Sequence, residues 1–178
     1  MVKMSGIKEL GSDLINESNP KKLHKKTKEY LVFQLYANSE FIYYKYGKDA
    51  LQEYYRFNQD SFFNLKMSGF LKMMEGIIKK LPKSLKIKEG LKMMVKELEF
   101  LEPPKNIEII EKTNKNATFK VNKCSIRKEF NKLARKGNKL ELIDKCCLWC
   151  IESIPYANKY GFEYSIELTE NGCFNYLK

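Results

Sequence analysis

The sequence predicts an α+β fold in which a helical N-terminal layer packs on a small antiparallel sheet built from two hairpins. Three observations predict this class: apolar residues recur at helical spacing through the first hundred residues, the period changes from 3.6 to 2 after Pro103-Pro104, and a second pair of alternating segments closes the chain. With 178 residues, 43 % of them hydrophobic, the chain can bury one core without disulfides. We therefore expect a single domain, 1–178, with a helical part over 1–102 and a part over 103–178 that carries every cysteine.

Four helices are expected in the first part. Their ranges are 27–46, a segment from residue 48 onward, 68–81, and a segment from residue 84 to the double proline. Gly47 follows the first helix as a natural stop, Pro82 ends the third, and the double proline forbids continuation of the fourth. The aromatic side chains of the first two helices are expected to form walls of the core or of a ligand cavity.

The second part mixes strands and helices. In chain order we expect strands at 107–113 and 117–123, a helix capped by Ser125 and ending near Gly137, a helix from about Leu140 into the 150s, and strands at 162–169 and 173–177. Asn171-Gly172 is the pair that best fits a two-residue hairpin turn, whose central residues have positive φ. That turn would make Glu170 the cross-strand partner of Cys173.

The charge pattern narrows the choice of partners. The net charge of +11 is spread along the chain and is almost all lysine, with only three arginines, Arg56, Arg127 and Arg135. Specific readers of nucleic acid rely on arginine, so the pattern argues against specific nucleic-acid binding and favours a lysine-rich solvated surface. No apolar run of about 18 residues and no signal peptide is seen, so we expect a cytoplasmic protein without a membrane span. A homodimer is compatible with these features.

Several catalytic classes are excluded by what the sequence lacks. His24 is the only histidine, so neither a Ser-His-Asp or Cys-His arrangement nor a histidine-rich metal site can be built. No GxGxxG, GxxxxGKS/T or HExxH pattern occurs, which leaves nucleotide-binding and zincin interpretations without support.

Three of the five cysteines lie in one short stretch, KCCLWC, at residues 145–150. An odd number of cysteines in a cytosolic chain indicates buried thiols, a metal site or a reactive sulfur, and each one taken alone is also a common small core residue. On one continuous helix Cys147 and Cys150 would share the buried face. Cys146 would point about 100° away and be dispensable.

The other two cysteines are expected to face the same region. Strand alternation turns Cys173 toward the helices, and Cys124 lies where a strand leads into a helix N-terminus, whose dipole favours a thiolate. The thiols predicted to converge between the sheet and one helix are those of Cys124, Cys147, Cys150 and Cys173. Zinc would accept all four, or three with Glu170 or Glu167 as an oxygen ligand, and the same thiols could hold an iron–sulfur cluster.

Three short motifs stand out in the C-terminal third, 117–178. They are Cys124-Ser125 at a strand-to-helix junction, Cys147-Leu148-Trp149-Cys150 on the following helix, and Gly172-Cys173-Phe174-Asn175-Tyr176 in the closing hairpin. With these motifs the segment resembles the L-2-amino-thiazoline-4-carboxylic acid hydrolase family and, more distantly, the 4-vinyl reductase ligand-binding domains. Two features depart from the family pattern: the proline after the first cysteine is missing, and Cys150 replaces the acidic residue of a CxxD-like motif.

The resemblance implies two alternative functions. The first is a hydrolase-like enzyme that acts on a sulfur- or nitrogen-containing small molecule, with Cys147, Cys173 and Glu170 as catalytic residues and Cys150 beside them. Its nucleophile would be a thiolate or a metal-activated water. The second is a non-enzymatic small-ligand-binding domain with a fold of the 4-vinyl reductase type. A structural zinc on Cys124, Cys147, Cys150 and Cys173 would then fix the hairpin against a helix, and a site made only of thiolates has no open position for catalysis.

Overall fold

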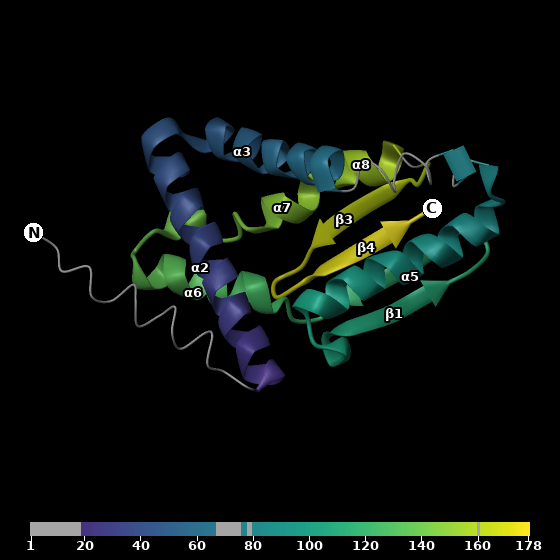
Figure 1. Ribbon diagram of the computed structural model, residues 1–178, viewed down its shortest axis with the longest axis horizontal. Helices are drawn as coiled ribbons and strands as arrows, with labels where there is room; N and C mark the ends of the chain where they lie inside the picture. The colour runs from purple at the N-terminus through teal and green to yellow at the C-terminus, as the bar shows by residue number, and fades with distance from the viewer. Residues whose placement is uncertain (1–18, 67–75, 78–79, 160) are drawn as a thin grey trace, which may run out of the picture.

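A four-stranded antiparallel sheet, with strand order β1-β2-β4-β3, forms one layer of the computed structural model (Figure 1). The strands are β1 (Ile107–Lys112), β2 (Ala117–Val121), β3 (Tyr164–Leu168) and β4 (Cys173–Leu177). The structure describes residues 19–66, 76–77, 80–159 and 161–178. Each predicted hairpin forms, and the two are joined where β2 pairs with β4, so the α+β class is confirmed.

The register of the closing hairpin differs from the prediction. Cys173 pairs with Leu168 on β3 and with Val121 on β2, and Glu170 lies in the turn instead of opposite Cys173. The Thr169 N–H donates to the Gly172 carbonyl at 3.0 Å, so Glu170 and Asn171 occupy the centre of the turn. Neither Asn171 nor Gly172 has a positive φ. This turn is therefore not of the two-residue type that an Asn-Gly pair usually forms.

Within the described residues, three long helices precede the sheet: α2 (Pro20–Tyr46), α3 (Lys48–Ser61), which continues into a π-helical turn at Phe62–Lys66, and α5 (Lys83–Leu101). The first begins at Pro20, earlier than predicted. The Asn19 side chain accepts the Lys21 N–H at 3.0 Å, and proline at the first helical position is favourable. Gly47, with φ of 94°, ends α2 as expected. Most of the predicted helix 68–81 lies outside the described residues.

The helix after β2, α6 (Ser125–Lys136), is capped by Cys124 and not by Ser125. The Cys124 Sγ accepts the Arg127 N–H at 3.4 Å. Ser125 instead gives its N–H and its hydroxyl to the buried carboxylate of Glu102, at 2.7 and 2.9 Å. A buried carboxylate at a helix N-terminus is stabilised by these donors and by the helix dipole.

The predicted helix from Leu140 into the 150s is broken. A 3-10 turn at Leu140–Leu142 is followed by α7 (Cys147–Ile151) and α8 (Ile154–Lys159). The interruption is at Asp144, whose φ of 65° is left-handed and incompatible with a continuing right-handed helix. This break changes the directions of the three cysteines that follow it.

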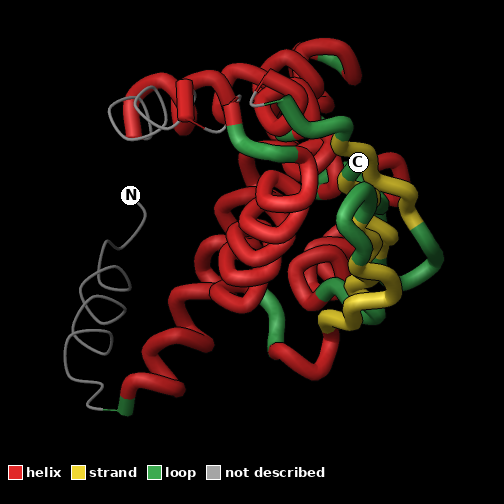
Figure 2. The backbone as a smooth tube through the Cα atoms, turned by 90° about the vertical axis from the view of Figure 1, so that its right-hand side faces the viewer, coloured by secondary structure: helices red, strands yellow, loops and turns green. Residues whose placement is uncertain are grey.

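Two apolar clusters form the core. In the first, α2 and α6 pack against the segment before α7, with Val32, Tyr36, Phe130, Ala134, Leu142, Cys146 and Cys147 buried. In the second, α5 covers the inner face of the sheet, where Ile87, Leu91, Ala117, Phe119, Phe162 and Leu177 are buried. Figure 2 shows the helices mainly to one side of the strands. The chain from α6 to β4 therefore connects the first cluster to the second.

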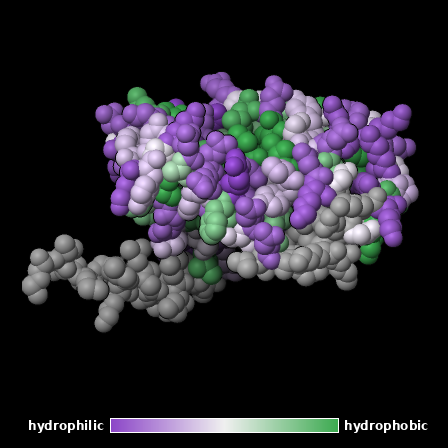
Figure 3. Space-filling model, turned by 90° about the horizontal axis from the view of Figure 1, so that it is seen from above, coloured by the Kyte–Doolittle hydropathy of each residue, from purple (hydrophilic) through white to green (hydrophobic). Residues whose placement is uncertain are grey.

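The surface seen from the α3 side is mostly hydrophilic, with a hydrophobic patch near its middle (Figure 3). None of the described helices combines the length and the apolar composition that a bilayer crossing requires.

Gly172 is required because of close backbone packing. A Cβ atom at this position would lie 1.7 Å from the Val121 carbonyl oxygen, and backbone cannot move aside as a side chain can. We expect Gly172→Ala to lower the free energy of unfolding by about 3 kcal/mol, measured by urea denaturation. Gly76→Ala is the control, since a Cβ atom there meets nothing within 4 Å, and at this exposed helical position it should leave stability unchanged or raise it by up to about 1 kcal/mol. Equal stability of the two variants would contradict this account of the turn.

Candidate functional site

The side chain of Arg127 holds together the segments that surround the cysteines. Its Nε and one terminal nitrogen donate to the two carboxylate oxygens of Asp144, at 2.6 and 2.7 Å. Its other terminal nitrogen donates to the carbonyls of Thr169 and Gly172 in the β3–β4 turn. The guanidinium is buried, and such bidentate pairing is the arrangement that stabilises a buried arginine.

Asp144 is also fixed by Asn131 of α6. The Asn131 amide donates to the carboxylate at 2.7 Å, and its oxygen accepts the Asp144 N–H at 2.9 Å. Four side-chain bonds therefore hold the residue at which the chain leaves its helical path. The Cys147 N–H bonds to the Asp144 carbonyl at 3.0 Å, so the start of α7 takes its position from this network.

Cys146 is not the bystander that a continuous helix predicts. It lies in the first apolar cluster and is only 5 % exposed. The hydrogen bond between its thiol and that of Cys147, together with burial, raises the pKa of Cys146 far above its ordinary value. The reason is the break at Asp144, which turns Cys146 and Cys147 inward together. Replacing Cys146 would therefore disturb the core.

Cys147 is the thiol that the surroundings favour as a thiolate. The hydrogen bond from Cys146 lowers its pKa, burial opposes the shift, and the positive charge of Arg127 lowers the pKa further. The side chain is buried at the start of α7. A thiol that receives a hydrogen bond and faces a cation is the usual environment of a nucleophilic cysteine.

The other three thiols have raised pKa values. Desolvation is the main cause at each: it raises the pKa of Cys124 to about 12 and also raises those of Cys150 and Cys173. Cys124, Cys173 and Cys147 also contribute to the raised pKa of Cys150. Cys150 has an exposed side chain, so the prediction that it shares a buried helix face with Cys147 is wrong.

A chain of polar contacts leads from β3 to Cys173. The Tyr164 hydroxyl donates to the Asn175 side-chain oxygen at 2.7 Å, and the Asn175 amide donates to the Cys173 Sγ at 3.4 Å. These side chains lie on the inner face of the sheet because Tyr164 pairs with Leu177 and Cys173 with Leu168. Burial raises the pKa of Tyr164, with contributions from Cys150 and Cys173. Tyr164 therefore keeps its proton at neutral pH.

The helix α7 is also held from the side of α3. The buried Glu152 carboxylate accepts the Gln52 amide at 2.9 Å and the Arg56 Nε at 3.1 Å. The Gln59 amide donates to the Trp149 carbonyl at 2.8 Å. These contacts fix the thiol region against the N-terminal helices.

The residues predicted to bind a metal are Cys124, Cys147, Cys150 and Cys173, with Glu170 or Glu167 as a further ligand. In the part of the chain that the structure describes, no three histidine, cysteine, aspartate or glutamate side chains are grouped so that they could hold a metal ion. Glu170 is exposed in the turn, and Glu167 lies on the opposite strand face from Cys173, where it accepts the Tyr176 hydroxyl at 2.7 Å. As placed, the residues do not fit zinc or an iron–sulfur cluster.

Four residues of this site were not predicted from the sequence: Arg127, Asp144, Tyr164 and Asn175. One sequence signal was present: arginine is rare in this lysine-rich chain. Two of the three arginines pair with carboxylates at this site, Arg127 with Asp144 and Arg56 with Glu152. Asn175 could have been found by its alternation with Cys173 on β4. Nothing in the local sequence indicated the left-handed Asp144.

Comparison with family models, with curated proteins and with solved structures gives no match to this chain.

The Arg127–Asp144 pair should make stability depend on pH. The hydrogen bonds from Arg127 lower the pKa of Asp144 in the folded state. Asp144 therefore contributes stability above its unfolded pKa of about 3.9, and this contribution is lost as the pH falls through the lower folded value. We expect Asp144→Asn to be less stable at neutral pH and to lose less further stability between about pH 5 and pH 2. Urea unfolding across this range measures the effect.

The control for this prediction is Asp60→Asn, at an exposed position on α3. It should leave the pH dependence of unfolding as in the parent protein. If Asp144→Asn and Asp60→Asn gave the same pH profile, Asp144 would not be the group responsible.

Proposed function

We propose that the protein is a hydrolase-like enzyme that acts on a sulfur- or nitrogen-containing small molecule and uses Cys147 as its nucleophile. The single observation that supports this best is the position of Cys147, whose N–H bonds to the carbonyl of Asp144 while the buried Arg127 guanidinium holds the Asp144 carboxylate. The pKa of Cys147 is lowered by Cys146 and Arg127, while those of the other four are raised. Such selective activation of one cysteine is what nucleophilic catalysis requires.

The surrounding groups suit this chemistry. The Cys147 thiolate would add to an electrophilic carbon bonded to sulfur or nitrogen, and the bond to the leaving heteroatom would break as that atom takes a proton. The thiol of Cys173, with its raised pKa, is a suitable proton source and is aligned by Asn175. Water would then release the product from Cys147. Glu170, in the exposed turn, has no step in this scheme.

A second candidate is the non-enzymatic ligand-binding domain with a structural zinc. It is supported by the lack of an accessible activated nucleophile: the Cys147 side chain is buried, and the raised pKa values of Cys124 and Cys150 disfavour their thiolates. Zinc binding would need these side chains to move together and lose their protons. A zinc that elemental analysis finds tightly held, and whose removal unfolds the protein, would favour this candidate.

The thiol contrast gives a direct test of the enzyme proposal. At about pH 7, iodoacetamide followed by peptide mass spectrometry should label Cys147 before the other four cysteines, because the thiolate is the reactive form. Cys147→Ser should abolish turnover of a thiazoline-type substrate, a loss of at least about a hundredfold. Cys150→Ser is the matched control from the same helix and should keep most of the activity.

One result would contradict the assignment of Cys147 as the nucleophile. If Cys147→Ser folds normally by circular dichroism and turns over the substrate as the parent does, Cys147 is not the nucleophile. Labelling of Cys150 ahead of Cys147 would show that access, and not activation, decides thiol reactivity here.

A further inference from the structure

The outward face of α2 carries a symmetric row of aromatic side chains. Ala37 is at its centre, Phe33 and Phe41 lie four residues to either side, and Tyr30 and Tyr44 lie seven residues to either side. Steps of four and seven residues keep all five positions within about 40° of one direction on an α-helix. The rings of Phe33, Phe41, Tyr30 and Tyr44 are 51, 56, 59 and 47 % exposed, and we call this row the α2 stripe. At one end the Tyr44 hydroxyl donates to Glu141 at 2.8 Å, so the segment after α6 reaches the edge of the stripe.

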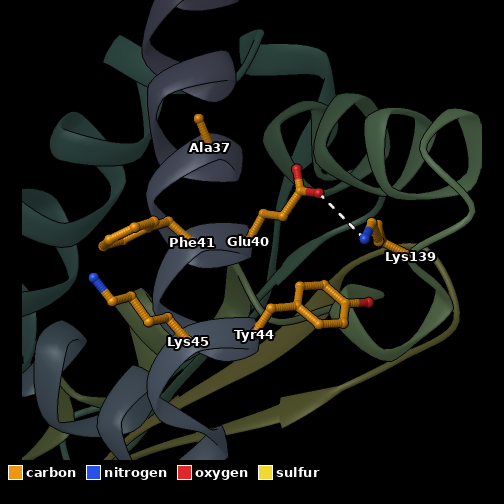
Figure 4. A pocket seen from close by; sticks show the side chains of 6 residues that line it. All are labelled: Ala37, Glu40, Phe41, Tyr44, Lys45 and Lys139. Atoms are coloured by element: carbon orange, nitrogen blue, oxygen red, sulfur yellow. Dashed lines mark ion pairs between the residues drawn. The ribbon is translucent and has the colours of Figure 1, made fainter.

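The small central residue leaves a hollow in the stripe. Ala37, Phe41 and Tyr44 line it together with Glu40, Lys45 and Lys139 (Figure 4). Phe41 and Tyr44 project from α2 beside this hollow, and Lys139 reaches from the loop after α6 to the Glu40 carboxylate at 3.6 Å. An apolar row with a small residue at its centre and polar groups along its edge has the composition of an interface core and rim.

We propose that the α2 stripe is the contact surface of a homodimer in which two α2 helices pack antiparallel about a two-fold axis at Ala37. The order Tyr, Phe, Ala, Phe, Tyr reads the same in both directions, and an isologous interface needs such a self-complementary surface. The two-fold places Ala37 against the partner's Ala37. Phe33 then faces the partner's Tyr44, and Phe41 faces the partner's Tyr30.

The area fits a dimer of modest affinity. Four half-exposed rings offer roughly 400 Å², about half of the 800 Å² per partner that a standard interface buries. Exposed Leu23 at one end of α2, and exposed Leu140 next to Lys139 beside the hollow, can supply part of the remainder. The ring edges and faces on the two copies would also gain from aromatic pairing.

The effect of salt distinguishes a homodimer from a complex with an anionic partner. Each chain carries a net charge of +11, so two copies repel each other and added salt should strengthen the dimer. Lys45 lies over the Phe41 ring at 5.0 Å and Lys139 over the Tyr44 ring at 4.1 Å, both at the edge of the stripe. Binding of a nucleic acid or an anionic membrane through these lysines would instead weaken with salt.

Sedimentation of the full chain tests the proposal. We expect a dimer at micromolar concentration whose dissociation constant falls between about 50 and 200 mM salt. Phe41→Ser should raise the dissociation constant at least tenfold without affecting the fold, since the ring is exposed. Phe57→Ser is the control, because Phe57 is also exposed, at 66 % against 56 % for Phe41, and lies on α3 outside the stripe.

Cross-linking tests the antiparallel geometry itself. Under mild oxidation Ala37→Cys should give a covalent dimer, because the two-fold brings the two substituted positions together. Leu31→Cys is the control, exposed on the same helix but about 120° from the stripe. A monomer at both salt concentrations, equal cross-linking of the two variants, or an assembly that forms only with RNA or anionic vesicles would overturn the proposal.

Discussion

Four hydrogen bonds from the guanidinium of Arg127 join α6, the residue where the predicted helix breaks, and the β3–β4 turn. Removing a guanidinium from water costs several kcal/mol, and only a partner set as complete as this one offsets that cost. Asp144, which precedes α7, and the turn that precedes β4 are therefore both held to α6. The same positive charge that holds the segments together also favours ionisation of Cys147.

The parts of the fold that local patterns encode were predictable. Alternating apolar and polar residues predicted both hairpins, Gly47 predicted the end of α2, and the double proline predicted the end of α5. The inward direction of Cys147 and Cys173 was also predictable, because burial on one face is a local pattern for both helices and strands. These predictions depended on residues within a few positions of the feature concerned.

The unpredicted features depend on contacts distant in sequence. Asp144 is left-handed because Arg127 and Asn131 hold it there, and KCCLWC alone reads as a continuous helix. The inward position of Cys146 follows from that break. The register of the closing turn likewise depends on the hydrogen bonds that Arg127 donates to the carbonyls of Thr169 and Gly172, and on how closely Gly172 approaches Val121. The spacing of the cysteines also could not indicate which thiol would have a lowered pKa.

The contact between Gly172 and the Val121 carbonyl also limits how this chain can vary. An inserted residue in the β3–β4 turn, or any side chain at its last position, would force β4 away from β2 and separate the two hairpins. Homologues that keep this architecture should therefore have a turn of constant length ending in glycine. The edge strand β1, exposed along most of its length, is free of that restriction and can accumulate substitutions and length changes.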